Sequence, residues 1–471
     1  MNKLFKNTAI YAVGEILPKI ISFLLLPVFT RYLSTSEYGI ISYTSSFMLL
    51  FTIVGTLSLN SYALRYYFEQ KEEKQRRMLL GTVYMVIGIM NVILIILGFL
   101  LFPMIINHYQ IQVPWDPYFK LALINNFLVS FSTIPLVIYR VRQDSAKYVL
   151  LSFSYSMLTF LFNVVFVVFL KQGILGYYHS TLIVSIPFFI IYANIIRKYA
   201  CFNITIEYVK EGLRFSLPLL PGATAFFFLN MVDRIILERN VLLSEIGIYN
   251  IAVTLTSAMG IIIQSGYRAV EPELFRYYGK PDYYNFVRKA QTAYFLAIYV
   301  GALLLALFSQ EVFIIMTAPS FHEGYNLVPI LIIGVVMSGQ NHIYGGVLAS
   351  EKRTKVQGGV SVIGASFSFV FNLLLIPLWG TIAAAFSRMF SYIIMNAVLF
   401  MKMTFPGKSI HKESLAVLLI LIIPHVMFRL FPAVSIVGFF SKVVVVILYL
   451  LFLLKLFSVS LIDIKMMLLK K

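Results

Sequence analysis

Long apolar stretches recur along the whole chain and are separated by short polar segments. A helix of about 20 apolar residues is long enough to cross the hydrocarbon core of a bilayer. No gap between the apolar stretches has room for a folded soluble domain, so the pattern predicts an all-α integral membrane protein. We expect about 14 transmembrane helices, with spans near residues 8–30, 38–64, 79–102, 119–139, 149–170, 174–196, 215–237, 245–267, 290–308, 326–349, 356–378, 380–401, 414–431 and 434–457.

Composition excludes a soluble globular protein. The chain has 471 residues, of which 60% are hydrophobic and only 12% are charged, whereas soluble domains are about 25% charged. The single cysteine, Cys201, excludes an internal disulfide. A bilayer is therefore the expected solvent for most of the chain.

The net charge of +18 is spread over many short loops and is not gathered on one basic face, so we expect no nucleic-acid partner. Of the 38 Lys and Arg residues, 29 fall in the loops on one side of the predicted membrane. Positively charged loops face the cytoplasm, so we predict that both termini are cytoplasmic in a multi-pass protein of a bacterial inner membrane. We count Lys19 and Arg388 as lying inside spans, and we assign Arg31, Lys120, Lys171, Arg234, Arg239, Arg429 and Lys442 to the other side.

A short repeat divides the chain into two halves. Residues 36–40 read Ser-Glu-Tyr-Gly-Ile, and residues 244–248 read Ser-Glu-Ile-Gly-Ile, an offset of 208 positions. The sequence Arg-Tyr-Tyr at 65–67 recurs at 276–278 with a slip of three residues. Such repeats are typical of transporters built from two similar halves. The repeat predicts an N-terminal lobe of six spans at 1–210, a C-terminal lobe of six spans at 211–405, and two further spans with a tail at 406–471.

Polar side chains within the spans are costly in lipid and usually face a bundle interior or a water-filled path. Helical spacing places two groups of them on equivalent faces of spans 2 and 8, although Ser, Thr and Asn also hold membrane helices together. Arg268 is harder to explain as packing alone. The two groups are Ser42, Ser45, Ser46, Thr52, Thr56 and Asn60 in span 2, and Asn250, Thr254, Ser257, Gln264 and Arg268 in span 8.

Charged residues inside spans are candidate functional residues. Glu15 precedes Lys19 by four residues, the spacing of a helical ion pair, and this pair either lines a cavity or forms an internal salt bridge. Asp233 and Arg234 form a second cluster with Asn230, where contact with substrate and extension toward the membrane surface are alternatives. Arg388 lies well inside its span. The carboxylates of Glu15 and Asp233 are candidates for proton or sodium coupling, although the adjacent base of each could simply keep it ionised.

Two segments carry a resemblance to a known family. Leu17-Pro18, residues 30–34 and Glu37-Tyr38-Gly39 in the first half, and residues 215–218, 230–234 and 247–249 in the second, resemble the oligosaccharide flippases of polysaccharide biosynthesis. These are the O-antigen and capsule type flippases of the multidrug/oligosaccharidyl-lipid/polysaccharide exporter superfamily. The resemblance covers spans 1 to 12.

The resemblance implies two six-helix lobes in a V around a cationic cavity that opens to alternate sides of the membrane. It implies a substrate, a polyprenyl-diphosphate-linked oligosaccharide, with membrane lipids and other polysaccharide-assembly proteins as partners. Arginine forks suit the diphosphate, and amides and hydroxyls suit the sugars. The candidates are Lys19, Arg31, Arg65, Arg234, Arg268 and Arg388 for the diphosphate, and Asn60, Asn250 and Gln264 for the sugars. We expect Lys19, Arg268 and Arg388 to converge on one cavity.

Three other functions have different sequence requirements. A multidrug extrusion antiporter would rely on carboxylates for cationic drugs, whereas the deep charges here are mainly basic. A peptidoglycan lipid-precursor flippase would share both architecture and diphosphate chemistry. An enzyme such as a membrane-embedded glycosyltransferase would want a long outer loop with catalytic residues. The sequence has no Gly-x-x-x-x-Gly-Lys nucleotide loop, and its six histidines lack ligand spacing, so we expect a non-enzyme without a metal site or organic cofactor.

Overall fold

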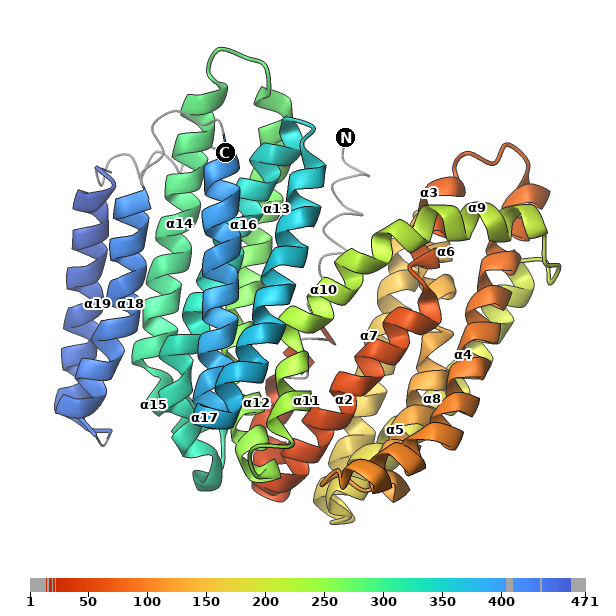
Figure 1. Cartoon of the computed structure of the whole chain (residues 1–471), viewed down its shortest axis with the longest axis horizontal. Coiled ribbons are helices and arrows are strands. Elements are labelled where there is room, and N and C mark those ends of the chain that lie inside the picture. The colour runs from red at the N-terminus through yellow and green to blue at the C-terminus, as the bar shows by residue number, and fades with distance from the viewer. Residues whose placement is uncertain are drawn as a thin grey trace. The chain divides into compact units, whose positions relative to one another are not determined.

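The computed structural model describes residues 14, 17, 18, 20, 21, 23–403, 410–432 and 434–458. Secondary structure in this part of the chain is entirely helical (Figure 1). The chain divides into two compact units, Met1–Gly247 and Ile248–Lys471, and the boundary falls inside one helix. The domain limits expected at residues 210 and 405 stay predictions.

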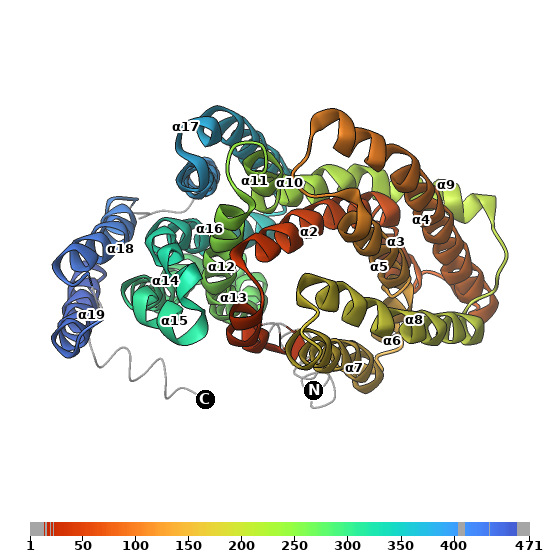
Figure 2. The ribbon, with the colours of Figure 1, turned by 90° about the horizontal axis from the view of Figure 1, so that it is seen from below.

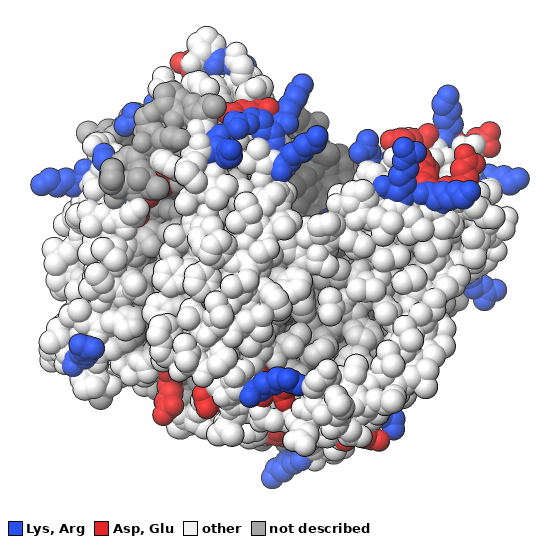
Figure 3. Space-filling view, in the orientation of Figure 1, with Lys and Arg blue, Asp and Glu red and all other residues white. Residues whose placement is uncertain are grey.

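Membrane-spanning character is clear from helix length and composition. Twelve segments of the described residues are long and apolar enough to cross a bilayer, and a shorter apolar helix occupies Phe23–Tyr32. On the face that Figure 3 shows, most charged side chains gather near the ends of the helices and leave a broad uncharged surface between them. The all-α membrane fold is therefore confirmed. Much of the first predicted span lies outside the described residues, so the total of fourteen stays a prediction.

The first unit is a bundle in which α2, α4, α5 and α8 pack together. Tyr43 of α2 and Tyr178 of α8 are buried in a core cluster with Phe119 of the adjoining η1. The elements of this unit are α2 (Thr35–Thr56), α3 (Leu59–Tyr66), α4 (Glu73–Tyr109), η1 (Trp115–Phe119), α5 (Lys120–Ser130), α6 (Thr133–Val141), α7 (Ser145–Asn163), η2 (Val164–Phe169), α8 (Gly173–Tyr199), α9 (Ile206–Ser216), η3 (Leu217–Leu219), α10 (Leu220–Asn230) and α11 (Val232–Leu237).

Local sequence explains where α2 begins and ends. The side chain of Ser34 accepts a hydrogen bond from the Glu37 amide at 3.2 Å, and Glu37 accepts one from the Ser34 amide at 2.7 Å. This capping box satisfies two amides that the first turn leaves free. Leu57 and Ser58 adopt the left-handed conformation, so the second predicted span forms two helices, α2 and α3.

The second unit is built around α16, which packs against α13, α14, α17 and α18 (Figure 2). The span that contains α16 is the most buried of the twelve, because 78% of its apolar stretch lies inside the protein. The elements are α12 (Leu243–Ser257), which crosses the boundary between the units, α13 (Met259–Tyr277), α14 (Tyr283–Leu307), α15 (Ser309–Met316), η4 (Pro319–Leu327), α16 (Val328–Ser350), α17 (Thr354–Lys402), α18 (Ile410–Leu430) and α19 (Ile436–Leu456).

Helix α17 is a hairpin of two helices. Gly380 has φ 56° and ψ −131°, a conformation that favours glycine. The Ser387 hydroxyl donates to the Ser368 carbonyl at 3.2 Å, although residues 19 apart in a straight helix would be about 28 Å apart. The sequence predicts a break here, between the spans at 356–378 and 380–401.

Candidate functional site

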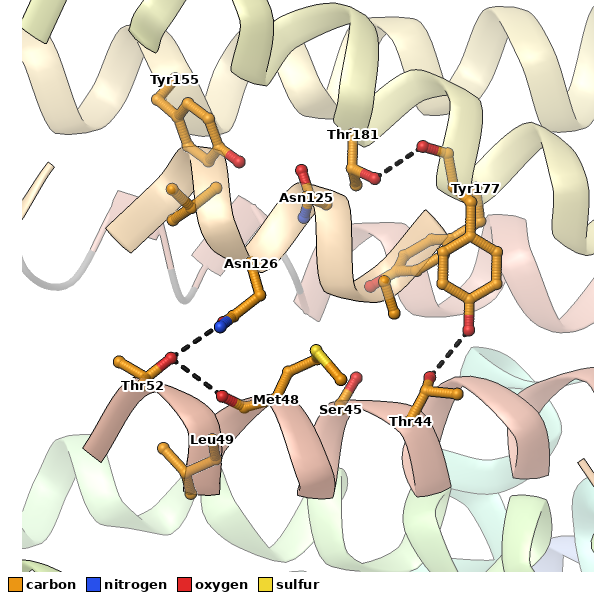
Figure 4. A pocket seen from close by; sticks show the side chains of 13 residues that line it. Thr44, Ser45, Met48, Leu49, Thr52, Asn125, Asn126, Tyr155, Tyr177 and Thr181 are labelled. Carbon is orange, nitrogen blue, oxygen red and sulfur yellow. Dashed lines mark hydrogen bonds between the residues drawn. The ribbon is translucent and has the colours of Figure 1, made fainter. Parts of the chain in front are cut away.

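A polar cavity of about 220 Å³ lies in the first unit between α2, α5, α7 and α8 (Figure 4). Its wall comes from helical positions three or four residues apart, which lie on one face of each helix. The lining residues are Thr44, Ser45, Met48, Leu49 and Thr52 of α2, Ala122, Asn125, Asn126 and Val129 of α5, Tyr155 of α7, and Tyr177, Tyr178 and Thr181 of α8.

Hydrogen bonds connect the helices around this cavity. Thr44 Oγ1 lies 2.7 Å from Tyr178 Oη and joins α2 to α8. Thr52 Oγ1 donates to Asn126 Oδ1 at 2.9 Å and joins α2 to α5. Ser185 Oγ of α8 donates to Asn125 Oδ1 at 2.6 Å. These bonds fix the orientation of both amides.

The same bonds leave ligand-binding groups available. Within the described residues, the amide nitrogens of Asn125 and Asn126, the Ser45 hydroxyl and the Tyr177 hydroxyl have no protein partner. Ser45 is exposed toward the cavity side of α2. Amide nitrogens can donate hydrogen bonds to a ligand, and hydroxyls can both donate and accept them.

None of the described residues that line the cavity is charged. Neutral amides and hydroxyls beside aromatic rings suit an uncharged group with many hydroxyls, such as a sugar. They do not supply the cations that a diphosphate requires. The described lining by itself therefore does not form a phosphate-binding site.

The polar group expected on one face of span 2 divides in two. Ser45 and Thr52 line the cavity. Ser42 and Ser46 are buried away from it, and Ser46 Oγ donates to the Ser42 carbonyl at 2.9 Å. Thr56 donates to the Thr52 carbonyl at 2.8 Å. Part of this group therefore serves helix packing, as hydroxyls in membrane helices often do.

Asp233 and Arg234 form a buried ion pair on α11. The two residues are 4% and 3% exposed, and Arg234 Nη1 lies 2.9 Å from Asp233 Oδ1. Arg234 also donates to the carbonyl of Asn230 in the preceding helix. Their assignment to substrate binding and ion coupling stays a prediction.

Arg65 and Asn60 both lie on α3. Arg65 is exposed, pairs with Glu69 at 3.8 Å and stands over the Phe215 ring at 5.4 Å. Asn60 is half-buried. Neither residue lines the cavity between α2, α5, α7 and α8, and Arg31 is exposed on the short helix Phe23–Tyr32.

The remaining candidates are spread over several helices. In the second unit, Asn250 is half-buried on α12, Gln264 and Arg268 are exposed on α13, and Arg388 is half-buried on α17. Glu15 and Lys19 lie outside the described residues. The convergence expected of Lys19, Arg268 and Arg388 therefore stays a prediction.

Seven polar cavity residues, one of which is Thr44, escaped the sequence reasoning. Asn125 and Asn126 are amides within an apolar span, so the cost of polar groups in lipid could have identified them. Tyr155, Tyr177, Tyr178 and Thr181 give no such signal, because tyrosine and threonine are common in packed membrane helices. The described residues contain no group of three or more His, Cys, Asp or Glu side chains that could hold a metal.

Comparison with known proteins identifies the family. The model of the family described as "Polysaccharide biosynthesis protein" matches residues 4–277, more than half of the chain. The chain belongs to this polysaccharide biosynthesis protein family. A second family model, MatE, matches residues 218–374, in agreement with the superfamily to which the sequence was assigned.

Curated relatives of this family member are distant. "Lsg locus putative protein 1" of Haemophilus influenzae is 25% identical over 282 residues, which are 58% of this chain. The chain spans 66% of that relative's length. An uncharacterized membrane protein of Methanocaldococcus jannaschii is 34% identical over 94 residues, 20% of this chain and 18% of the relative.

Solved structures share the fold. The lipid II flippase MurJ in an inward closed conformation aligns with a TM-score of 0.76 at 17% identity, covering 96% of this chain and 99% of MurJ. An inward-facing multidrug resistance transporter of the MATE family aligns with a TM-score of 0.63 at 14% identity, covering 83% of this chain and 98% of the transporter. The family member therefore has the fold of multi-pass transporters.

Proposed function

We propose that the protein is a flippase that moves polyprenyl-diphosphate-linked oligosaccharides from the cytoplasmic to the outer face of a bacterial inner membrane. Transport would proceed by alternating access and would supply surface polysaccharides such as O-antigen or capsule. The observation that carries the proposal is the cavity between α2, α5, α7 and α8, whose described lining is uncharged, in a chain of the polysaccharide biosynthesis family.

The cavity favours a sugar over a cationic drug. A cation in a low-dielectric site is normally balanced by a carboxylate, whereas the described lining of this cavity has amides, hydroxyls and tyrosine rings but no carboxylate. Asn125, Asn126 and Ser45 can donate hydrogen bonds to sugar oxygens. Arg268 and Arg388 of the second unit are the candidates for the diphosphate, because an arginine fork binds phosphate oxygens in pairs.

A peptidoglycan lipid-precursor flippase is the second candidate. The observation in its favour is the fold shared with the lipid II flippase over 96% of this chain. Its cargo carries the same diphosphate and a sugar head group, so the two functions differ in the length and identity of the sugar portion.

Cargo competition in proteoliposomes tests the proposal. The purified protein would be reconstituted with a fluorescent polyprenyl-diphosphate oligosaccharide, and the initial rate of translocation would be measured against added unlabelled cargo. We expect efficient competition by the oligosaccharide lipid and weak competition by the peptidoglycan precursor. Efflux of a cationic dye driven by a proton gradient, without movement of either lipid, would favour the multidrug antiporter and overturn the proposal.

A further inference from the structure

Glu413 of α18 is a buried carboxylate in the second unit. The residue is 8% exposed. Gln291 Nε2 of α14 donates to its Oε1 at 2.9 Å, and the Tyr344 hydroxyl of α16 donates to its Oε2. The carboxylate thus connects α18 to two neighbouring helices.

Neither hydrogen-bond donor carries a charge. The two bonds and the first turn of α18 lower the cost of burying an ionised carboxylate, but they leave its negative charge in place. A buried charge is normally paired with an opposite charge or neutralised by a proton. Glu413 therefore needs a positive partner.

The described residues supply no such partner. None of their ion pairs includes Glu413. Among the described residues, the titratable groups beside the Glu413 carboxylate or bonded to the α18 backbone near it are phenols, which are uncharged at neutral pH. These are Tyr344 of α16, Tyr299 of α14, and Tyr449 of α19, which donates to the Ala416 carbonyl at 2.9 Å.

The described charged groups on the helices that pack against α18 have other partners or are at least partly exposed. His342 of α16 stacks on Tyr267 with ring centroids 5.1 Å apart. Arg288 and Lys289 of α14 and Lys402 of α17 are exposed, and Lys412 of α18 is half-buried. Lys442 of α19 forms an ion pair with Glu311, with 2.8 Å between Nζ and Oε1.

A cavity of about 90 Å³ lies beside the Glu413 carboxylate. Gln340, Asn396 and Ser414 are its other polar lining residues apart from Tyr344. Asn396 is 7% exposed, and its Nδ2 donates to Gln340 Oε1 at 2.7 Å. Its Oδ1 is buried with no hydrogen-bond partner, an arrangement that is rare unless a ligand or water supplies the donor.

We propose that this cavity binds one monovalent cation, a proton or Na⁺, between the Glu413 carboxylate and the Asn396 amide oxygen. Carboxylate, amide and hydroxyl oxygens are the ligands that hard cations prefer. A single carboxylate balances one positive charge, so a monovalent ion fits better than a divalent one. Occupancy neutralises Glu413 and stabilises the packing of α18 against α14 and α16. The inference does not depend on the transported cargo.

Thermal unfolding of the full-length protein in lipid nanodiscs tests the site. The unfolding temperature would be followed as Na⁺ replaces choline at constant ionic strength, and separately as pH is varied without Na⁺. The variant is Glu413→Gln, and the matched control is Glu323→Gln, which alters an exposed carboxylate of the same unit. For a sodium site, we expect Na⁺ to raise the unfolding temperature by several degrees in the native and control proteins only.

A proton site gives a different result. The unfolding temperature of the native protein would then fall as pH rises, with no response to Na⁺, and Glu413→Gln would remove this dependence. Infrared spectroscopy would show the carbonyl stretch of a buried carboxylic acid in the native protein and not in the variant. If native protein and Glu413→Gln respond identically to Na⁺ and to pH, the proposal is wrong.

A second variant keeps the test decisive should Glu413→Gln fail to fold. Asn396→Ala preserves the carboxylate and removes the amide oxygen. We expect it to weaken the response to Na⁺ or to shift the pH at which the infrared band disappears. An unchanged response in this variant would exclude Asn396 from the site and overturn the proposed geometry.

Discussion

Gly39 and Gly247 hold the same position in the two copies of the sequence repeat, and each lies against the backbone of the other copy. A Cβ atom on Gly39 would overlap the carbonyl oxygen of Leu243, and one on Gly247 would overlap that of Thr35. Thr35 and Leu243 are themselves equivalent under the offset of 208 residues. The close approach is therefore reciprocal between the two copies of the short repeat.

Alanine at either glycine should destabilise the protein. A backbone carbonyl cannot move aside as a flexible side chain can, so we expect Gly39→Ala and Gly247→Ala each to cost about 1–3 kcal/mol. Thermal unfolding in detergent would measure the loss. Gly222→Ala is the control, because a Cβ atom there meets nothing within 4 Å. Unfolding temperatures equal to that of the control would show that the close contact does not exist.

The buried pair of Lys442 and Glu311 should anchor α19 to α15. Lys442 is 1% exposed, and its Nζ lies 2.8 Å from Glu311 Oε1 and 3.0 Å from Gln310 Oε1. Removal of one partner leaves the other charge buried, so we expect Lys442→Met to cost about 3–5 kcal/mol. The double variant Lys442→Met with Glu311→Leu should recover much of that loss. A double variant less stable than Lys442→Met would contradict this account.

Asp233 provides a test between a structural and a coupling role. The carboxylate compensates Arg234 inside the first unit at 2.9 Å, so Asp233→Asn should lower the free energy of unfolding by about 3 kcal/mol or more. Chemical denaturation would measure the change, with the exposed Asp282→Asn as control. Normal stability combined with lost ion dependence of transport would instead identify Asp233 as a coupling residue.

Two loop carboxylates should affect stability with opposite pH dependence. Burial raises the pKa of Glu238, which follows α11 and accepts a hydrogen bond from the Gln112 amide. The folded protein then binds the Glu238 proton more tightly than the unfolded chain does. The contribution of Glu238 to the free energy of unfolding is therefore greatest at low pH. It declines as pH rises from about 4.3, the ordinary glutamate value, through the raised pKa. Glu238→Gln should flatten this part of the profile of unfolding temperature against pH.

Asp144 is the natural comparison, because the Lys147 side chain and amide lower its pKa. Asp144 stabilises the folded protein at pH values above the ordinary pKa of aspartate. This stabilisation is lost as the pH falls through the lowered pKa. Asp144→Asn should therefore reduce stability near neutral pH and leave it unchanged in acid. The effect should be small, because the pair is partly exposed. A Glu238→Gln profile with this same sign would contradict the assignment of Glu238.

The two arginine candidates of the second unit should affect cargo that carries a diphosphate. We expect Arg268→Ala and Arg388→Ala each to slow translocation by about 10-fold or more, since a charged hydrogen bond contributes about 1.5–3 kcal/mol. Lysine at these positions should restore only part of the rate, because it lacks the bidentate fork. Arg288→Ala, at another exposed arginine of the same unit, is the control. Equal rates in all variants would remove these residues from the phosphate site.

Much of the fold could be predicted because hydropathy and breaks in helices are local properties. The break near Gly380 is visible in the sequence, and the structure turns there. The division of the second span at Leu57 and Ser58 was not predictable, because non-glycine residues adopt the left-handed conformation there. Only the surrounding structure selects that conformation over a continuous helix.

The cavity was harder to predict than the fold. Thr52 stood out as a polar residue in an apolar span, but its partner Asn126 is 74 residues away. Asn125 is likewise oriented by Ser185, 60 residues further along the chain. Charge attracted the sequence reasoning to Asp233 and Arg234, which pair with each other. The rotation of each helix about its axis decides which polar groups meet, and that rotation is set by tertiary packing.

The central claim is that a sugar portion occupies the cavity between α2, α5, α7 and α8 during flipping. The most direct measurement is the initial rate of translocation of a fluorescent polyprenyl-diphosphate oligosaccharide in proteoliposomes, for native protein, Asn126→Ala and the exposed control Asn107→Ala at matched insertion. The account predicts that Asn126→Ala is slowed by about 10-fold, as expected for loss of one buried hydrogen bond and its partner, while Asn107→Ala matches the native rate. Equal rates in all three proteins, or no translocation of this lipid by the native protein, would contradict it.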